Sequence, residues 1–142
     1  MQVVSRSPEE TKQLGRELVG QASKLAVNVV ALYGELGAGK TTLIQGMGKV
    51  LGIKQHLASP TFILVREYPI EGANWQRLYH VDLYRLGEAA ELRAVDLAEL
   101  WQDKTNLVVI EWAERAALPR KLAVNLKIKT ETEREISYEI ED

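Results

Sequence analysis

The 142-residue sequence contains no cysteine. Disulfide bonds, thiolate nucleophiles and cysteine-ligated zinc are therefore excluded, and an intracellular location is consistent with this composition. Residues 1–6 lack the long apolar segment of a signal peptide, and no other run is long and apolar enough to span a bilayer. From these absences we expect a cytoplasmic protein with no membrane partner.

The sequence also has no marked excess of either charge. Its 18 basic and 20 acidic side chains give a net charge of −2, which does not indicate a surface that holds nucleic acid by neutralising phosphates. Any connection to RNA is therefore expected to run through a partner. With 46% hydrophobic residues, a chain of this length buries one sizeable core, so we expect a single domain over residues 1–142.

The most informative stretch is the glycine-rich segment 34–41, which follows the apolar run 29–33 and leads into an apolar helix pattern. Its spacing of Gly, four residues and Gly-Lys-Thr is the P-loop pattern. Glycines let successive backbone N–H groups turn around a phosphate, at the positive end of the following helix. Lys40 is placed to reach the β- and γ-phosphates, and the Thr41 hydroxyl is the expected ligand of Mg²⁺.

The patterns around this loop predict an α/β fold of the P-loop NTPase type, with a mixed sheet, flanking helices and a C-terminal antiparallel hairpin. Helices are expected over 8–24, 40–51, 88–94 and 97–101. Strands are expected over 29–33, 61–65, 77–82, 107–110, 122–128 and 136–140, with a loop over 69–74. The strand 107–110 is continuously apolar and should be covered on both faces, whereas the hairpin alternates and should bury one face.

Ser7 is a suitable cap for the first helix, with Pro8 in the first turn and Glu10 at the capping-box position. Thr11 lies off the predicted apolar stripe and is a candidate to face a ligand. The stripe consists of Leu14, Leu18, Val19, Ala22 and Leu25.

A P-loop needs a further acidic group at the carboxyl end of a neighbouring strand. Glu111, after the apolar strand, is the best candidate for the metal, and Asp82 also ends a strand. One is expected to hold the metal, directly or through water, and the other to orient the attacking group. Their division of roles stays open. His80 shares strand phase with Leu78, which favours a hydrogen-bonded core histidine over a catalytic base.

Other candidates are less sharply defined. Trp112 is compatible with a place in the core or beside a nucleotide. Arg134 has the parity of the apolar positions of the last strand, which directs it toward an anion such as Glu111 or a phosphate; a side chain that reaches solvent is the alternative. Thr61 fits a switch threonine or a strand-edge threonine, and Tyr84 and Arg85 fit surface positions.

Four segments in this order, Gly34-Glu-Leu-Gly-Ala-Gly-Lys-Thr-Thr, Ser59-Pro-Thr-Phe, His80-Val-Asp-Leu-Tyr-Arg and Ile110-Glu-Trp, resemble the TsaE family over nearly the whole chain. The resemblance implies an ATP- and Mg²⁺-dependent ATPase, weak alone, that works with the TsaD and TsaB pair in tRNA threonylcarbamoyladenosine biosynthesis. It implies that Thr41 and Glu111 hold Mg²⁺ and that Asp82 and Trp112 lie in motifs tied to activity. Asp96 and Ala113 depart from the glycine and proline common in the family.

The expected catalytic residues are thus Asp82 and Lys40. The expected nucleotide-binding residues are Thr11, Gly37, Ala38, Gly39, Lys40, Thr41, Thr42, Trp112 and Arg134. Two alternatives remain beside an ATPase that gates a tRNA-modifying complex. A small-molecule kinase would need a lid rich in arginine, and no such insertion is visible. A GTP-dependent switch would need the guanine-reading Asn-Lys-x-Asp pattern, which is absent.

Overall fold

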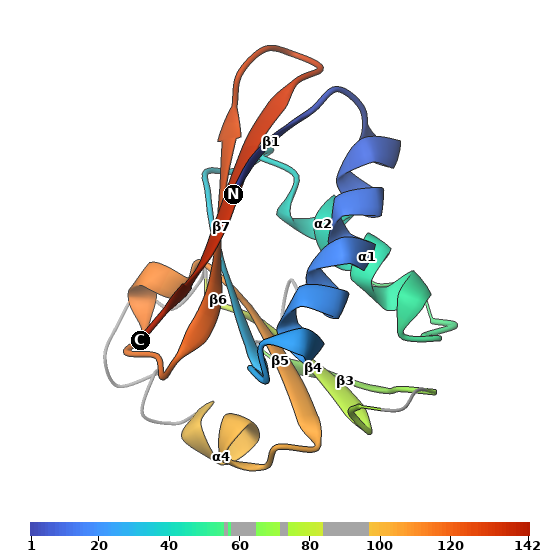
Figure 1. Cartoon of the computed structure of the whole chain (residues 1–142), viewed down its shortest axis with the longest axis vertical. Coiled ribbons are helices and arrows are strands. Elements are labelled where there is room, and N and C mark those ends of the chain that lie inside the picture. The colour runs from blue at the N-terminus through green and yellow to red at the C-terminus, as the bar shows by residue number, and fades with distance from the viewer. Residues whose placement is uncertain (56, 58–64, 72–73, 84–96) are drawn as a thin grey trace.

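The computed structural model of the chain describes residues 1–55, 57, 65–71, 74–83 and 97–142 (Figure 1). In chain order the elements are β1 (Gln2–Ser5), α1 (Pro8–Lys24), β2 (Val29–Tyr33), α2 (Lys40–Val50), β3 (Val65–Pro69), β4 (Arg77–Asp82), α4 (Leu97–Gln102), β5 (Asn106–Glu111), the short 3-10 helix η1 (Ala113–Arg115), β6 (Lys121–Ile128) and β7 (Arg134–Glu141).

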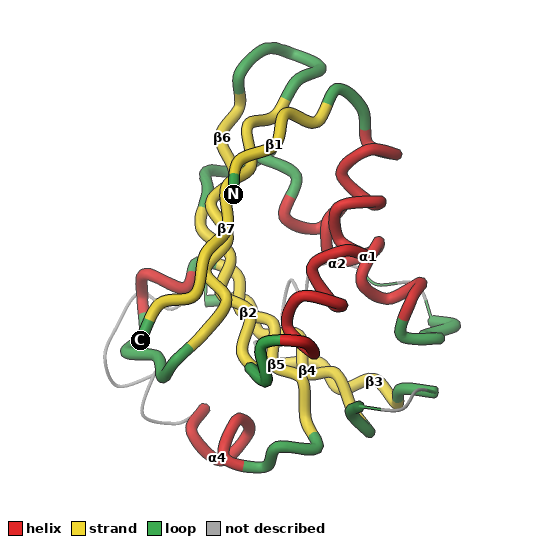
Figure 2. Tube along the Cα trace, in the orientation of Figure 1, coloured by secondary structure: helices red, strands yellow, loops and turns green. Residues whose placement is uncertain are grey.

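The strands form one mixed seven-stranded sheet in the order β1-β7-β6-β2-β5-β4-β3 (Figure 2). The central strands β6, β2, β5 and β4 are parallel to their neighbours in this group, while β3, β7 and β1 each pair antiparallel at the sides. The predicted α/β class, the mixed sheet and the antiparallel β6–β7 hairpin are confirmed. This arrangement brings the carboxyl ends of β2, β5 and β4 to one edge of the sheet.

Both faces of the central sheet are covered. Helices α1 and α2 lie on the same side (Figure 1), where Val30 and Leu32 of β2 face the larger apolar cluster. Val29 and Ala31 point the opposite way, into a smaller cluster that includes Leu97 of α4 and residues around η1. Every residue of β5 is buried, so the prediction of a strand covered on both faces is confirmed.

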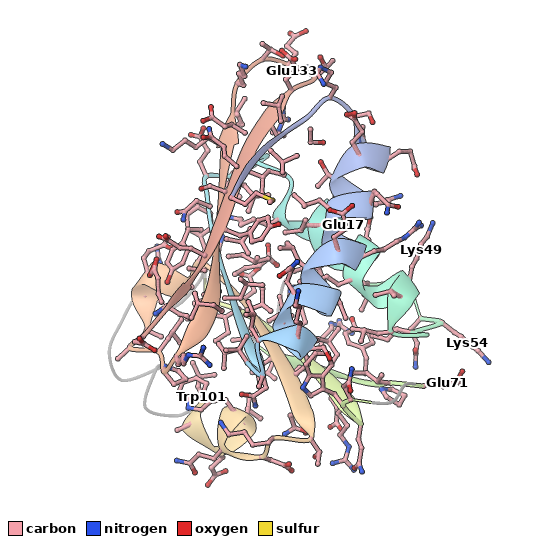
Figure 3. The ribbon with its side chains drawn as sticks, viewed as in Figure 1. Glu17, Lys49, Lys54, Glu71, Trp101 and Glu133 are labelled. Atoms are coloured by element: carbon pink, nitrogen blue, oxygen red, sulfur yellow. The ribbon has the colours of Figure 1, made fainter. Side chains whose placement is uncertain are left out.

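Helix α1 begins as its sequence predicts. The Ser7 side chain accepts a hydrogen bond from the Glu10 backbone N–H at 3.1 Å. The Glu10 carboxylate accepts one at 2.6 Å from the N–H of Arg6, one residue before the cap, and not from Ser7 as in a regular capping box. The helix ends at Lys24, also as predicted. Its exposed positions include Glu17, which Figure 3 labels on α1 beside the strands. The described part of the chain has no helix with the length and apolarity to cross a membrane.

Helices α1 and α2 pack closely because glycines lie where they meet. A Cβ atom at Gly15 would overlap the carbonyl oxygen of Leu43, and one at Gly46 would overlap the backbone of Lys12. The two backbones therefore approach more closely than side chains permit. Gly15 on α1 and Gly46 on α2 both permit this close approach.

Several predicted details are wrong. Thr11 is not off the buried stripe of α1 but on it, with 3% of its surface exposed, whereas Leu25 is the C-terminal cap and is 37% exposed. The first half of β6 is buried on both faces because it pairs with β2 inside the sheet. Strand β3 continues to Pro69, where a loop was expected. It pairs antiparallel with β4.

Candidate functional site

The loop between β2 and α2 has the backbone geometry that its glycines predict. Gly39 caps α2 with φ of 102°, in the left-handed region, and no side chain caps the first turn of the helix. Gly34 has φ of 155°, and a Cβ atom there would lie 2.7 Å from the Leu126 carbonyl oxygen of β6. The loop thus lies close against β6 and leaves the N–H groups at the start of α2 without a side-chain acceptor. An anion is the natural partner for such a helix end.

Lys40 is the first residue of α2 and is only 5% exposed. Its Nζ donates a hydrogen bond to the Gly34 carbonyl oxygen and lies 3.5 Å from the centre of the Trp112 ring, a cation–π contact. Burial lowers the pKa of the Lys40 ammonium, and the charges of Glu111, Glu114 and Asp82 oppose that shift. The lysine is therefore held inside the site by backbone and aromatic contacts, with carboxylates nearby.

Trp112 lies beside the P-loop, over Lys40, and also packs against the smaller apolar cluster. Its φ and ψ are 58° and 44°, a left-handed conformation that is costly for a large aromatic residue. This backbone turn follows directly on β5 and starts η1. It brings the indole ring over Lys40 while Glu111 keeps its place in the strand.

Asp82 and Glu111 end neighbouring parallel strands and are direct register partners. They are 9% and 3% exposed, so both carboxylates are largely removed from solvent. Because both influence the pKa of Lys40, the two acids and the P-loop lysine form one electrostatic cluster. The prediction that two strand-end carboxylates meet at the P-loop edge agrees with this geometry.

His80 is fully buried, and its Nε2 lies 2.6 Å from Oε2 of Glu111. Within the described residues, the Nδ1 atom of the same ring has no hydrogen-bond partner. The expected hydrogen-bonded core histidine is thus present. Its partner, the candidate metal ligand, was not anticipated, because strand phase reveals a face and not a contact with another strand.

Arg134, at the start of β7, reaches the P-loop. Its Nε and Nη2 atoms donate to the Gly37 carbonyl oxygen at 3.3 and 3.1 Å. Its Nη1 donates to carbonyl oxygens of the β6–β7 turn, at 2.9 Å from Thr130 and 3.0 Å from Glu133. Neither of the predicted anions is its partner among these bonds. The guanidinium instead ties the turn to the phosphate-binding loop.

The other predicted binding residues lie in or beside the loop. Ala38 is 1% exposed, and its backbone N–H donates to the Glu35 carbonyl oxygen at 3.1 Å, while Thr41 and Thr42 are half-buried in the first turn of α2. The Thr11 methyl lies near Gly39. The Thr11 hydroxyl is 2.7 Å from the Ser5 hydroxyl, so this buried group already has a partner in β1.

The donor set at this edge suits Mg²⁺. The hydroxyl of Thr41 and the carboxylate of Glu111 are hard oxygen donors, which this ion prefers, and Asp82 adds a second carboxylate nearby. No group of three or more acidic or histidine side chains poised for a metal occurs within the described ranges. Mg²⁺ at P-loops typically takes only one or two protein carboxylates and completes its shell with phosphate oxygens and water, so the set fits.

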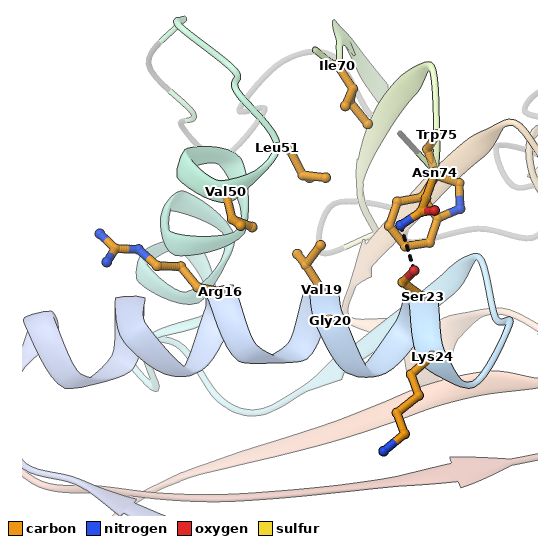
Figure 4. A pocket seen from close by; sticks show the side chains of 10 residues that line it. All are labelled: Arg16, Val19, Gly20, Ser23, Lys24, Val50, Leu51, Ile70, Asn74 and Trp75. Atoms are coloured by element: carbon orange, nitrogen blue, oxygen red, sulfur yellow. Dashed lines mark hydrogen bonds between the residues drawn. The ribbon is translucent and has the colours of Figure 1, made fainter. Parts of the chain in front are cut away.

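A separate groove of about 400 Å³ lies away from these residues, between α1, the end of α2 and residues that lie between β3 and β4 (Figure 4). Val19, Leu51 and Trp75 line it, and Asn74 donates a hydrogen bond to Ser23 at its side. Its walls are mainly apolar. Residues 58–64 and 84–96 lie outside the described part of the chain. They include the candidates Thr61, Tyr84 and Arg85, the departure at Asp96, most of the expected strand 61–65 and the expected helix 88–94.

The mixed sheet and the glycine loop between β2 and α2 define the chain as an α/β protein of the P-loop NTPase fold. Residues 5–136 match the family described as threonylcarbamoyl adenosine biosynthesis protein TsaE, and the chain belongs to this family. It is 43% identical to TsaE of Nostoc sp. over 121 residues, which are 83% of this chain and 71% of that protein.

Two further relatives cover almost the whole chain. TsaE of Treponema pallidum is 36% identical over 140 residues, covering 96% of this chain and 98% of the relative. The crystal structure of YdiB from Bacillus subtilis superimposes with a TM-score of 0.72 at 29% identity, covering 97% of this chain and 83% of that one. The resemblance inferred from the four sequence segments is confirmed.

Proposed function

We propose that this protein binds ATP with Mg²⁺ at the P-loop and hydrolyses it in support of threonylcarbamoyladenosine modification of tRNA, in the cytoplasm where tRNA is modified. The observation that supports this most is the convergence of Lys40, Asp82 and Glu111 at the carboxyl edge of the sheet. A lysine, a metal-binding carboxylate and a second carboxylate are the protein groups that phosphoryl transfer to water requires.

Each residue has a distinct proposed role. The backbone of residues 37–42 and Lys40 hold the phosphates, and Arg134 supports the loop at Gly37. Thr41 and Glu111 would hold Mg²⁺, which when bound neutralises charge on the phosphate oxygens. Asp82 orients the attacking water, and Trp112 borders the nucleotide. Thr11 belongs to the site through its methyl group beside Gly39, since its hydroxyl is bonded to Ser5.

The proposed partners are the TsaB and TsaD proteins, with tRNA reached only through them. The net charge of −2 argues against independent binding to RNA. Hydrolysis by the protein alone should be slow. Among the described residues, Lys40 and Arg134 are the cations that contact the P-loop backbone, and Arg134 is engaged by carbonyl groups. A missing positive group supplied by a partner changes P-loop hydrolysis by about 10³–10⁵-fold.

The test has two parts. Calorimetry with ATP and ADP, each with Mg²⁺, should show binding by the wild type and a large loss in Lys40→Ala. Hydrolysis should then be measured with and without the TsaB–TsaD pair, together with the affinity of that pair for the ATP- and ADP-bound protein. We expect tighter association in ATP and faster hydrolysis with the pair. Equal affinities in both nucleotide states would exclude nucleotide-gated association, and transfer of phosphate to a small acceptor would indicate a kinase.

A further inference from the structure

His80 occupies an unusual position for a polar side chain. It is 0% exposed and lies on the same face of β4 as Leu78, which belongs to the larger apolar core. Its Nε2 atom lies 2.6 Å from Oε2 of Glu111, within hydrogen-bond distance. Since Nδ1 has no hydrogen-bond partner among the described residues, the ring contributes one strong polar contact and leaves one nitrogen unpaired.

Packing alone does not account for a histidine here. An unpaired buried nitrogen destabilises the folded protein, and an apolar residue of similar size would avoid this cost. Glu111, by contrast, needs a donor, because an ionised carboxylate that is only 3% exposed is costly without one. Donation from Nε2–H satisfies Oε2 and fixes its position, while Oε1 is left for other ligands.

We infer that His80 is a positioning residue, whose Nε2–H holds the Glu111 carboxylate in the orientation that binds the metal. The inference rests on the proposed function, because the metal role of Glu111 is part of it. Partners that fix a ligating side chain generally matter for affinity, and their removal weakens metal binding by about 10–100-fold. His80 acts through Glu111 and does not itself contact nucleotide or metal.

Three substitutions separate positioning from packing. His80→Gln places an amide N–H near the position of Nε2 and keeps a donor for Glu111. His80→Asn is equally polar, but its shorter side chain places the amide near the position of Nδ1. His80→Leu removes the hydrogen-bond donor and replaces the ring with an apolar side chain that still fills the space. Glu111→Gln is the reference for loss of the ligand itself.

The readout is Mn²⁺ binding in the presence of ADP, followed by electron paramagnetic resonance, with ADP affinity in EDTA measured alongside. We expect His80→Gln to bind Mn²⁺ within about threefold of the wild type, and His80→Asn and His80→Leu to bind it about 10–100-fold more weakly. ADP affinity in EDTA should change less than about twofold in all three. In a double-mutant cycle, His80→Leu should add little to Glu111→Gln, because the two residues act as one unit. Circular dichroism and urea unfolding establish that each variant is folded.

Wild-type Mn²⁺ affinity in a folded His80→Asn or His80→Leu variant, with affinity lost in Glu111→Gln, would overturn the positioning role and leave the proposed function intact. Parallel losses of Mn²⁺ affinity and of metal-free ADP affinity would also overturn it, because a general disturbance of the site would then explain both. Wild-type Mn²⁺ affinity in Glu111→Gln would overturn the metal assignment in the proposed function, and the inference with it.

Discussion

The Nζ atom of Lys40 lies over the face of the Trp112 indole, 3.5 Å from the centre of the ring. The backbone of Trp112 is in the left-handed conformation. The two residues come from different elements, the start of α2 and the turn after β5. The contact therefore links the phosphate-binding loop to the strand that ends in Glu111. Lys40 also donates a hydrogen bond to the carbonyl oxygen of Gly34 at the other end of its loop, so its side chain links the two ends of the loop.

Trp112→Leu should lower the free energy of unfolding of the nucleotide-free protein more than Trp112→Phe, because only phenylalanine keeps a ring for Lys40. A cation–π contact of this kind contributes about 0.5–2 kcal/mol. Urea unfolding of both variants, alone and combined with Lys40→Met, measures the coupling in a double-mutant cycle. Additive effects of Trp112→Leu and Lys40→Met would mean that the contact contributes nothing to stability.

Lys40 should also give the stability a specific dependence on pH. Burial lowers its pKa in the folded protein, so between the folded and unfolded pKa values the unfolded chain binds more protons. The free energy of unfolding contributed by this group therefore rises with pH through that window. The free energy of unfolding of the wild type, minus that of Lys40→Met, should therefore become more positive from neutral to alkaline pH. Urea unfolding from pH 7 upward tests this, with Lys127→Met as the control for removing one exposed positive charge. A decrease would contradict the prediction.

Features set by neighbouring residues were predictable from the sequence. The Ser7 cap, the P-loop and the strand Arg77–Asp82 depend on local spacing and on the period of two or 3.6 residues. Thr11 was misplaced because an apolar stripe was traced through apolar side chains alone. The hydroxyl of Ser5, which lets Thr11 be buried, comes from another element.

Relations between elements were beyond the reach of these patterns. The hairpin pattern of β6 and β7 was correct, but the insertion of β6 beside β2 depends on how the whole sheet is ordered. Similarly, strand ends indicated Asp82 and Glu111 separately. Their register, the bond of His80 to Glu111 and the place of Trp112 over Lys40 arise only when the parallel strands are aligned.

Gly15→Ala should strongly destabilise the protein, although alanine is the better helix former. The added methyl group would overlap the Leu43 carbonyl oxygen, and because that atom is backbone, α1 and α2 would have to move apart. Overpacking of this kind costs about 1–3 kcal/mol or more. Gly20→Ala in the same helix is the matched control, since nothing lies within 4 Å of a Cβ there. It should stabilise by about 0.5–1 kcal/mol. Urea unfolding measures both, and equal effects would show that the close helix contact is not limiting.

Asp82→Asn should separate ATP binding from ATP hydrolysis. The amide keeps the size of the carboxylate but removes its basicity and charge, so a water that Asp82 orients would lose its acceptor. ATP affinity should stay within a few-fold, whereas single-turnover hydrolysis in the presence of the TsaB–TsaD pair should fall by about 10²–10⁴-fold. Asp103→Asn is the matched control, because Asp103 is exposed and precedes β5 at the end opposite to Glu111. Calorimetry and rapid-quench measurements on both variants give the two quantities. If Asp82→Asn hydrolyses ATP at the wild-type rate, Asp82 has no part in positioning the water, and Glu111 becomes the carboxylate to test for that role.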